Sequence, residues 1–143
     1  MNNALSKVLI FKILATLIAW CIPLMLFPTS WMVAAGFPAA EPILYTKLLG
    51  MAYLALLVGY AYGLKATLNA QDARPTVMMG IVSNLGASLI MLFYGLDGAW
   101  ADWGPYAQVH MWLSTCSAFL ISAGLAVFGL SKKDENSEAS FSQ

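Results

Sequence analysis

Four long apolar runs, separated by short polar connections, dominate this sequence and restrict what it can fold into. Each run is close to the ~20 residues that an α-helix needs to cross the hydrocarbon core of a bilayer. Charged residues make up only 10% of the chain, whereas a soluble domain carries about 25%. Because so few charges cannot cover a surface in water, the sequence predicts a helical membrane protein that crosses the bilayer several times.

The apolar runs define the expected fold. We place four transmembrane helices at residues 8–27, 42–64, 75–96 and 105–130. The connections are short, so neighbouring helices should be antiparallel, which gives an all-α, up-down-up-down bundle in one domain, residues 1–130. Pro23 should kink the first helix, because its ring removes a backbone hydrogen bond. The polar residues 131–143 should form a disordered cytoplasmic tail.

Basic residues indicate the orientation of the bundle. One side of it holds Lys7, Lys12, Lys65, Arg74, Lys132 and Lys133, and the other side holds Lys47. Because cytoplasmic connections are enriched in lysine and arginine, both termini should be cytoplasmic. Lys12, near the predicted start of the first helix, should extend its side chain to the lipid headgroups.

Lys47 and His110 are the sharpest candidates for a site. Each lies five residues after the proline that opens its helix, so both should sit ~7.5 Å below the same face of the bundle. Ionisable groups at this depth are costly and often functional, and the two can line an outward-facing pocket. As the structural alternative, Lys47 reaches the headgroups and His110 bonds as a neutral side chain. The other groups in reach are Glu41, Tyr45, Tyr53 and Tyr106.

Acidic residues suggest a second kind of site. Asp97 and Asp102 lie in the connection before the last helix, and with Glu41 they can form an acidic outer mouth for a cation. Aspartate also favours turns, and acidic groups favour helix N-termini, so a purely structural role explains the same residues.

Small and polar residues mark the faces where helices should pack. In lipid such residues allow close approach and hydrogen bonds between helices. The candidates are Gly59, Gly63, Ser83, Asn84, Ser114 and Ser117. These faces can serve the interior of the bundle or an interface between subunits. Asn84, in the middle of its helix, needs a partner, and a helix–helix hydrogen bond would supply it.

The residue inventory excludes several functions. One histidine cannot ligate two haems, and no group of residues has metal-ligand spacing or forms a glycine-rich phosphate loop. No basic stripe suggests a nucleic acid. Cys21 and Cys116 lie inside apolar runs, which argues against a disulfide framework, although the two can approach each other. The first helix lacks the acidic residue expected of a small multidrug antiporter, and the strong charge bias argues against a dual-topology fluoride channel.

Part of the sequence resembles a known family. Phe27-Pro28, Gly36–Pro42 and the Leu-Leu-Gly step Leu48–Gly50 are similar to the pattern of the small four-helix DoxX-like membrane proteins. The resemblance covers about the first half of the chain. It implies a four-helix fold in the inner membrane of a bacterium, and some members of that group are associated with quinone-linked sulfur oxidation. No catalytic residue is carried over.

These observations lead to three functional hypotheses. The first is a non-enzymatic accessory or assembly subunit of a membrane complex, with a membrane-protein partner or a second copy of the chain. The second is a module that binds a quinone or a lipid and is linked to redox chemistry, with Lys47 and His110 lining its pocket. The third is a small transporter or channel that uses the acidic mouth.

Overall fold

The computed structural model describes residues 3–39 and 43–130, and all secondary structure in these residues is helical. The elements are α1 (Asn3–Thr16), η1 (Leu17–Cys21), α2 (Ile22–Leu26), α3 (Thr29–Ala34), α4 (Ile43–Leu68), α5 (Arg74–Leu96) and α6 (Pro105–Leu130). Glu41 and the predicted tail at 131–143 lie outside the described residues.

Four helices in the described residues are long and apolar enough to cross a membrane: Ala4–Leu26, Ile43–Leu68, Arg74–Leu96 and Pro105–Leu130. At most 22% of the most apolar stretch of each helix is buried inside the structure. So much exposed apolar surface does not suit a soluble monomer, but it suits helices surrounded by lipid. The predicted all-α fold with four apolar helices is therefore confirmed, and it indicates a multi-pass membrane protein.

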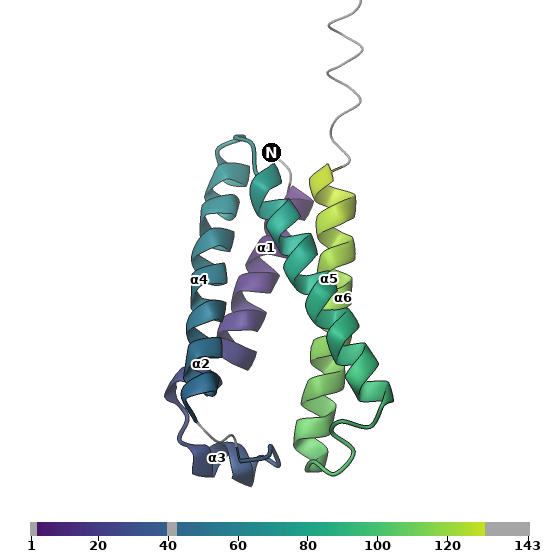
Figure 1. Ribbon diagram of the computed structural model, residues 1–143. Helices are drawn as coiled ribbons and strands as arrows, with labels where there is room; N and C mark the ends of the chain where they lie inside the picture. The colour runs from purple at the N-terminus through teal and green to yellow at the C-terminus, as the bar shows by residue number, and fades with distance from the viewer. Residues whose placement is uncertain (1–2, 40–42, 131–143) are drawn as a thin grey trace, which may run out of the picture.

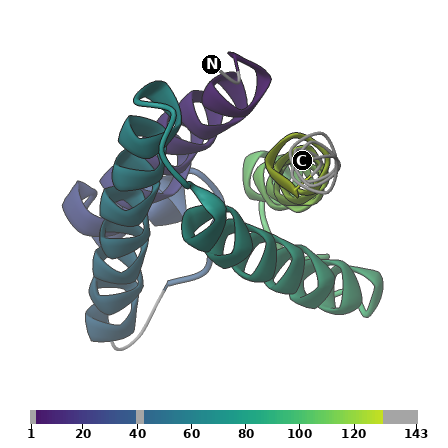
Figure 2. The same ribbon diagram turned by 90° about the horizontal axis from the view of Figure 1, so that it is seen from above.

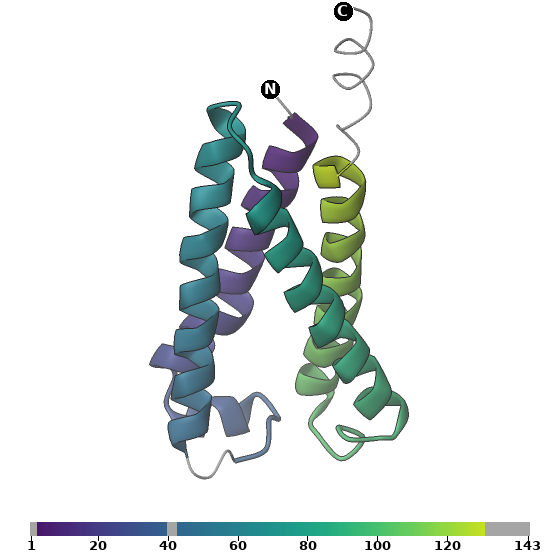
Figure 3. The same cartoon turned by 45° about the horizontal axis from the view of Figure 1, so that its top comes forward.

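The ends of these helices gather at two ends of the molecule (Figure 1). The upper end in Figure 1 holds the start of α1, the α4–α5 connection and the end of α6, and the lower end holds α3 and the α5–α6 connection. Seen from above, α1 and α4 lie together and α6 stands opposite them (Figure 2). Helix α5 starts near α4 and runs obliquely to the lower end of α6 (Figures 1 and 3).

The core lies toward the upper end. It is formed by buried residues from all four spans: Leu5, Leu9, Tyr60, Val77, Ile121 and Leu125. Close approach of α4 to α5 depends on small residues there, since a Cβ added at Gly63 would meet the side chain of Thr76, and one added at Gly59 would meet Met79. The core explains a correction to the first helix, which begins at Asn3 rather than at the predicted residue 8: packing of Leu5 and Leu9 orders its first turns.

The second predicted helix also needs a correction, because α4 continues to Leu68 rather than ending at residue 64. The added turn contains Thr67, which is buried and donates a hydrogen bond from Oγ1 to the carbonyl oxygen of Gly63 over 2.8 Å. Because Thr67 is buried, packing of this turn carries the helix beyond its apolar segment, and the hydrogen bond satisfies the buried hydroxyl.

A π-helical turn directly precedes the region of Pro23, where the sequence predicts a kink. In η1, one turn before Pro23, the backbone N–H of Ile22 bonds to the carbonyl of Leu17 rather than to that of Ile18. Proline has no N–H to continue the regular α-helical pattern, so the preceding turn widens. Trp20 lies within this turn, and its orientation therefore depends on the π-helical register.

The lower end is held by a contact between two loops. The N–H of Gly104, before α6, donates to the carbonyl oxygen of Gly36, after α3, over 2.9 Å. A Cβ built on either glycine would lie 2.6 Å from the Cα of the other. The ring of Phe37 packs against Trp103 and His110. The core thus joins the four spans toward the upper end, and the contact between Gly36 and Gly104 joins two loops at the lower end.

Candidate functional site

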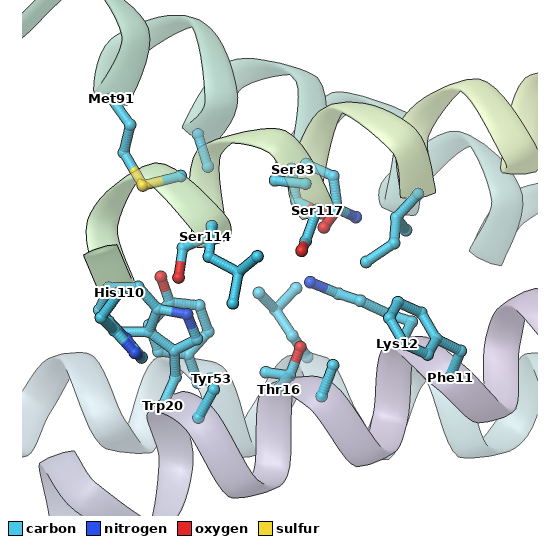
Figure 4. A pocket seen from close by; sticks show the side chains of 18 residues that line it. Phe11, Lys12, Thr16, Trp20, Tyr53, Ser83, Met91, His110, Ser114 and Ser117 are labelled. Carbon is cyan, nitrogen blue, oxygen red and sulfur yellow. The ribbon is translucent and has the colours of Figure 1, made fainter. Parts of the chain in front are cut away.

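A pocket of about 260 Å³ lies between the core and the loop contact, lined by residues of all four spans (Figure 4). Its polar lining consists of Lys12, Thr16, Tyr53, Ser83, Asn84, His110, Ser114 and Ser117. Thr16, Asn84 and Ser117 stand near the middle of their spans, so the pocket lies at mid-depth of the apolar region. Polar groups at this depth are rare because they are costly in lipid, and they commonly mark a functional site.

Lys12 is the cation of this pocket. Because α1 begins at Asn3, Lys12 lies ~13 Å along the helix, too far in for the predicted place at the headgroups. Its Nζ lies 5.6 Å from the centre of the Tyr60 ring, within the range of a cation–π contact, and points into the pocket (Figure 4). Within the described part of the chain, Nζ has no hydrogen-bond or ion-pair partner.

Sequence reasoning missed Lys12 as a site residue because the predicted helix began too late. A usable signal was present: Leu5, Leu9, Lys12 and Thr16 are spaced by four, three and four residues. That spacing keeps all four on one face of a helix. Once Leu5 and Leu9 are assigned to the core, Lys12 must face the interior of the bundle as well.

A buried hydrogen-bond network forms the wall beside Lys12. Asn84 donates from Nδ2 to the hydroxyl of Tyr60 over 2.9 Å and to the carbonyl of Gly80 over 2.6 Å. The Tyr60 hydroxyl also lies 3.1 Å from Oγ of Ser83, a second hydrogen bond. These bonds join α4 to α5 and fix the ring that Lys12 faces, so the helix–helix partner expected for Asn84 is Tyr60.

Aromatic rings close the lower end of the pocket. Trp20 stacks on Tyr53, with ring centres 5.7 Å apart, and contacts the His110 ring at 5.0 Å. Phe37 also contacts the His110 ring, with ring centres 5.6 Å apart. His110 and Tyr53, both predicted as site residues, thus line the pocket together with Trp20, which the sequence did not single out.

Lys47 lies elsewhere. Its Nζ donates to the backbone carbonyls of Met25 and Phe27 over 2.9 and 3.2 Å. These oxygens end the first span and have no partner within its helix, and lysine is well suited to bond them. Lys47 lines a separate hollow of about 30 Å³, so the structure does not place it with His110.

The remaining predicted site residues lie outside the pocket. Tyr45 and Tyr106 have exposed side chains. Asp97 ends α5, and Asp102 is exposed in the connection to α6. Across residues 3–39 and 43–130, no three His, Cys, Asp or Glu side chains gather where they could hold a metal ion. Cys21 is buried and Cys116 exposed, and both are free thiols.

Replacing Lys47 with methionine should lower the free energy of unfolding by about 1–2 kcal/mol, because two terminal carbonyls lose a charged donor. Lys65→Met is a matched control, since Lys65 is exposed on the same helix, and it should change stability by no more than about 0.5 kcal/mol. Unfolding in mixed detergent micelles measures both. Equal losses for the two variants would show that the hydrogen bonds of Lys47 contribute nothing.

The pocket combines one cation, three hydroxyl-bearing serines, a threonine, a tyrosine, an amide and an imidazole with apolar walls. Such a set can bind and orient a polar group that accepts hydrogen bonds. Comparison of the chain with protein-family models, curated proteins and solved structures finds no match. The resemblance to DoxX-like proteins therefore stays an expectation.

Proposed function

We propose that this chain is a membrane protein that binds a lipid-soluble ligand, a quinone or a lipid, in the pocket at mid-depth. One observation carries the proposal: Lys12 projects into this pocket without a hydrogen-bond or ion-pair partner among the described residues. A cation at this depth is costly unless a partner approaches it. The other walls are largely apolar, which suits a ligand taken from the bilayer.

The two ends of the pocket can bind different parts of a ligand. Near the core, Lys12 and the hydroxyls of Thr16 and Ser117 supply donors for a carbonyl or carboxyl oxygen (Figure 4). Near the loop contact, Trp20, Tyr53 and His110 line the pocket with aromatic rings that a ring or a chain can contact. Lys12 takes the role that the sequence had suggested for Lys47.

The test is the set of small molecules that the protein retains. Ala87 lines the pocket on α5, so Ala87→Phe should fill part of it. Ala123 is exposed on α6, and Ala123→Phe adds the same bulk outside. Organic extraction of the purified proteins, followed by mass spectrometry, should find a lipid-soluble molecule with the wild type and Ala123→Phe, and at least about tenfold less of it with Ala87→Phe. Equal amounts in all three proteins would refute the proposal.

The orientation and location of the protein are part of the proposal. With Lys12 assigned to the pocket, the charge bias is five residues (Lys7, Lys65, Arg74, Lys132 and Lys133) against Lys47. This bias supports an up-down-up-down bundle with both termini in the cytoplasm. The location in a bacterial inner membrane is proposed on the resemblance to DoxX-like proteins. A reporter enzyme that is active only in the cytoplasm should be active when it is fused to the C-terminus. An inactive fusion would indicate the opposite orientation.

The hypothesis of an accessory or assembly subunit stays a prediction, and purification in mild detergent with a partner or a second copy would test it. The transporter or channel hypothesis also stays a prediction, tested by flux into liposomes. The relationship to DoxX-like proteins is proposed on the motif around Gly36–Pro42. It can be tested by whether sequences intermediate between this chain and DoxX-like proteins keep that motif.

A further inference from the structure

The pocket has a mouth toward the lipid. Of the described residues that line it, Phe11 on α1 and Leu113 on α6 alone are exposed, at 56% and 64% of their surface. Both are apolar, and both belong to helices that stand opposite each other when the bundle is seen from above (Figure 2). A side chain that lines a pocket and is also exposed marks its opening, so this pocket opens sideways between α1 and α6.

The size of the pocket limits what it can enclose. Sites that bury a drug-sized molecule usually have volumes of about 300–1,000 Å³, and this pocket has about 260 Å³. It can therefore hold the polar end of a lipid and the first part of a chain, but not a whole lipid. The rest of the chain must leave through the mouth, where Phe11 and Leu113 offer apolar contacts.

The charge of the pocket favours an acid. Lys12 brings a cation, and among the described residues that line the pocket none is an aspartate or a glutamate. His110, the other titratable base there, lies at the opposite end, in contact with Trp20 and Phe37. A charged group in a medium of low dielectric constant is strongly stabilised by an opposite charge at contact distance. The described residues supply no such charge at Lys12, and an anionic ligand would supply it.

From these three observations we infer that the pocket binds a single-chain carboxylic acid of the fatty-acid type. Its carboxylate pairs with Nζ of Lys12 and accepts hydrogen bonds from Thr16 and Ser117, and its chain leaves between Phe11 and Leu113. A carboxylic acid is neutral when protonated, so it can reach the mouth through the bilayer, whereas a phosphate ester would carry its charge through the lipid. On binding, the acid releases that proton to solvent and pairs as the carboxylate with the ammonium group of Lys12. This inference rests on the proposed ligand-binding function and names the class of ligand.

The experiment compares a long-chain fatty acid with its methyl ester, which has the same chain and no acidic proton. Native mass spectrometry of the full chain in maltoside micelles, at increasing concentrations of each compound, gives the fraction of protein that carries one molecule. The wild type should bind the acid at least about tenfold more tightly than the ester, because only the acid can form the ion pair. Lys12→Met should reduce binding of the acid to the level of the ester. Lys65→Met, an exposed control on α4, should preserve the preference for the acid.

The outcomes separate this inference from the proposal it rests on. Equal binding of acid and ester by the wild type would overturn the inference, and the proposed function would then apply to a neutral lipid-soluble ligand. This comparison uses the wild type alone, so it does not depend on a variant that might fold poorly. An acid preference that survives in Lys12→Met would overturn it as well. If neither compound binds and no extracted molecule distinguishes Ala87→Phe from the wild type, the ligand-binding function itself is refuted.

Discussion

Replacing Tyr60 with alanine should lower the free energy of unfolding by about 3–5 kcal/mol, the usual cost of deleting a large buried side chain. Tyr60 is 0% exposed and packs in the core with Leu9 and Val77. Its hydroxyl bonds to Asn84 and Ser83, and its ring faces Lys12. The substitution therefore removes packing, the hydrogen bonds between α4 and α5, and the cation–π contact together.

The same helix provides the control for this prediction. Tyr62 lies two residues further along α4 and is 69% exposed, so Tyr62→Ala should change the free energy of unfolding by no more than about 0.5 kcal/mol. Titration with a denaturing detergent, followed by circular dichroism, measures both variants. A loss for Tyr62→Ala as large as that for Tyr60→Ala would contradict the assignment of Tyr60 to the core.

Replacing Gly36 with alanine should destabilise the protein by about 2–4 kcal/mol and loosen the lower end of the pocket. Gly36 has φ of +88°, a conformation that costs alanine about 1 kcal/mol. The added methyl group would also collide with the backbone of Gly104, which cannot rotate away as a side chain can. Overpacking of this kind adds about 1–3 kcal/mol. Separation of the loops would break the Gly104–Gly36 hydrogen bond and move Phe37 from His110.

A substitution at Gly98 separates the cost of the backbone conformation from the cost of the collision with a neighbouring loop. Its φ is +83°, but a Cβ there would meet only Ala101, at 3.9 Å. Gly98→Ala should therefore cost only the backbone term, about 1 kcal/mol. Thermal unfolding in detergent compares the two variants, and a shift in tryptophan fluorescence reports on the rings near Trp103. If both variants lost the same stability, the contact between Gly36 and Gly104 would not contribute to the fold.

The sequence predicted the fold class because length and apolarity act over whole runs. Four runs long enough to cross a bilayer are four apolar helices in the structure. The start of the first helix depended on packing instead, because the turn with Leu5 is ordered by contact with the other spans. Because the predicted start of this helix was too late, the prediction placed Lys12 at the headgroups, whereas in the structure it lines the pocket.

Side-chain partners were harder to predict than helices. Lys47 and His110 were predicted to lie at a similar depth, but depth does not determine the direction of a side chain. Lys47 turns to the open carbonyls of Met25 and Phe27, while His110 meets Trp20, whose direction depends on the π-helical turn before Pro23. Neither the free carbonyls nor the widened turn can be derived from the spacing of residues alone.

The most direct test of the central claim is an experimental structure of the protein purified from its own membrane and kept in lipid throughout. We expect elongated non-protein density between α1 and α6, with one end within hydrogen-bonding distance of Lys12 Nζ and the other passing Phe11 and Leu113. A well-resolved pocket that contains no such density, or in which Lys12 Nζ is bonded to another part of the chain, would contradict it.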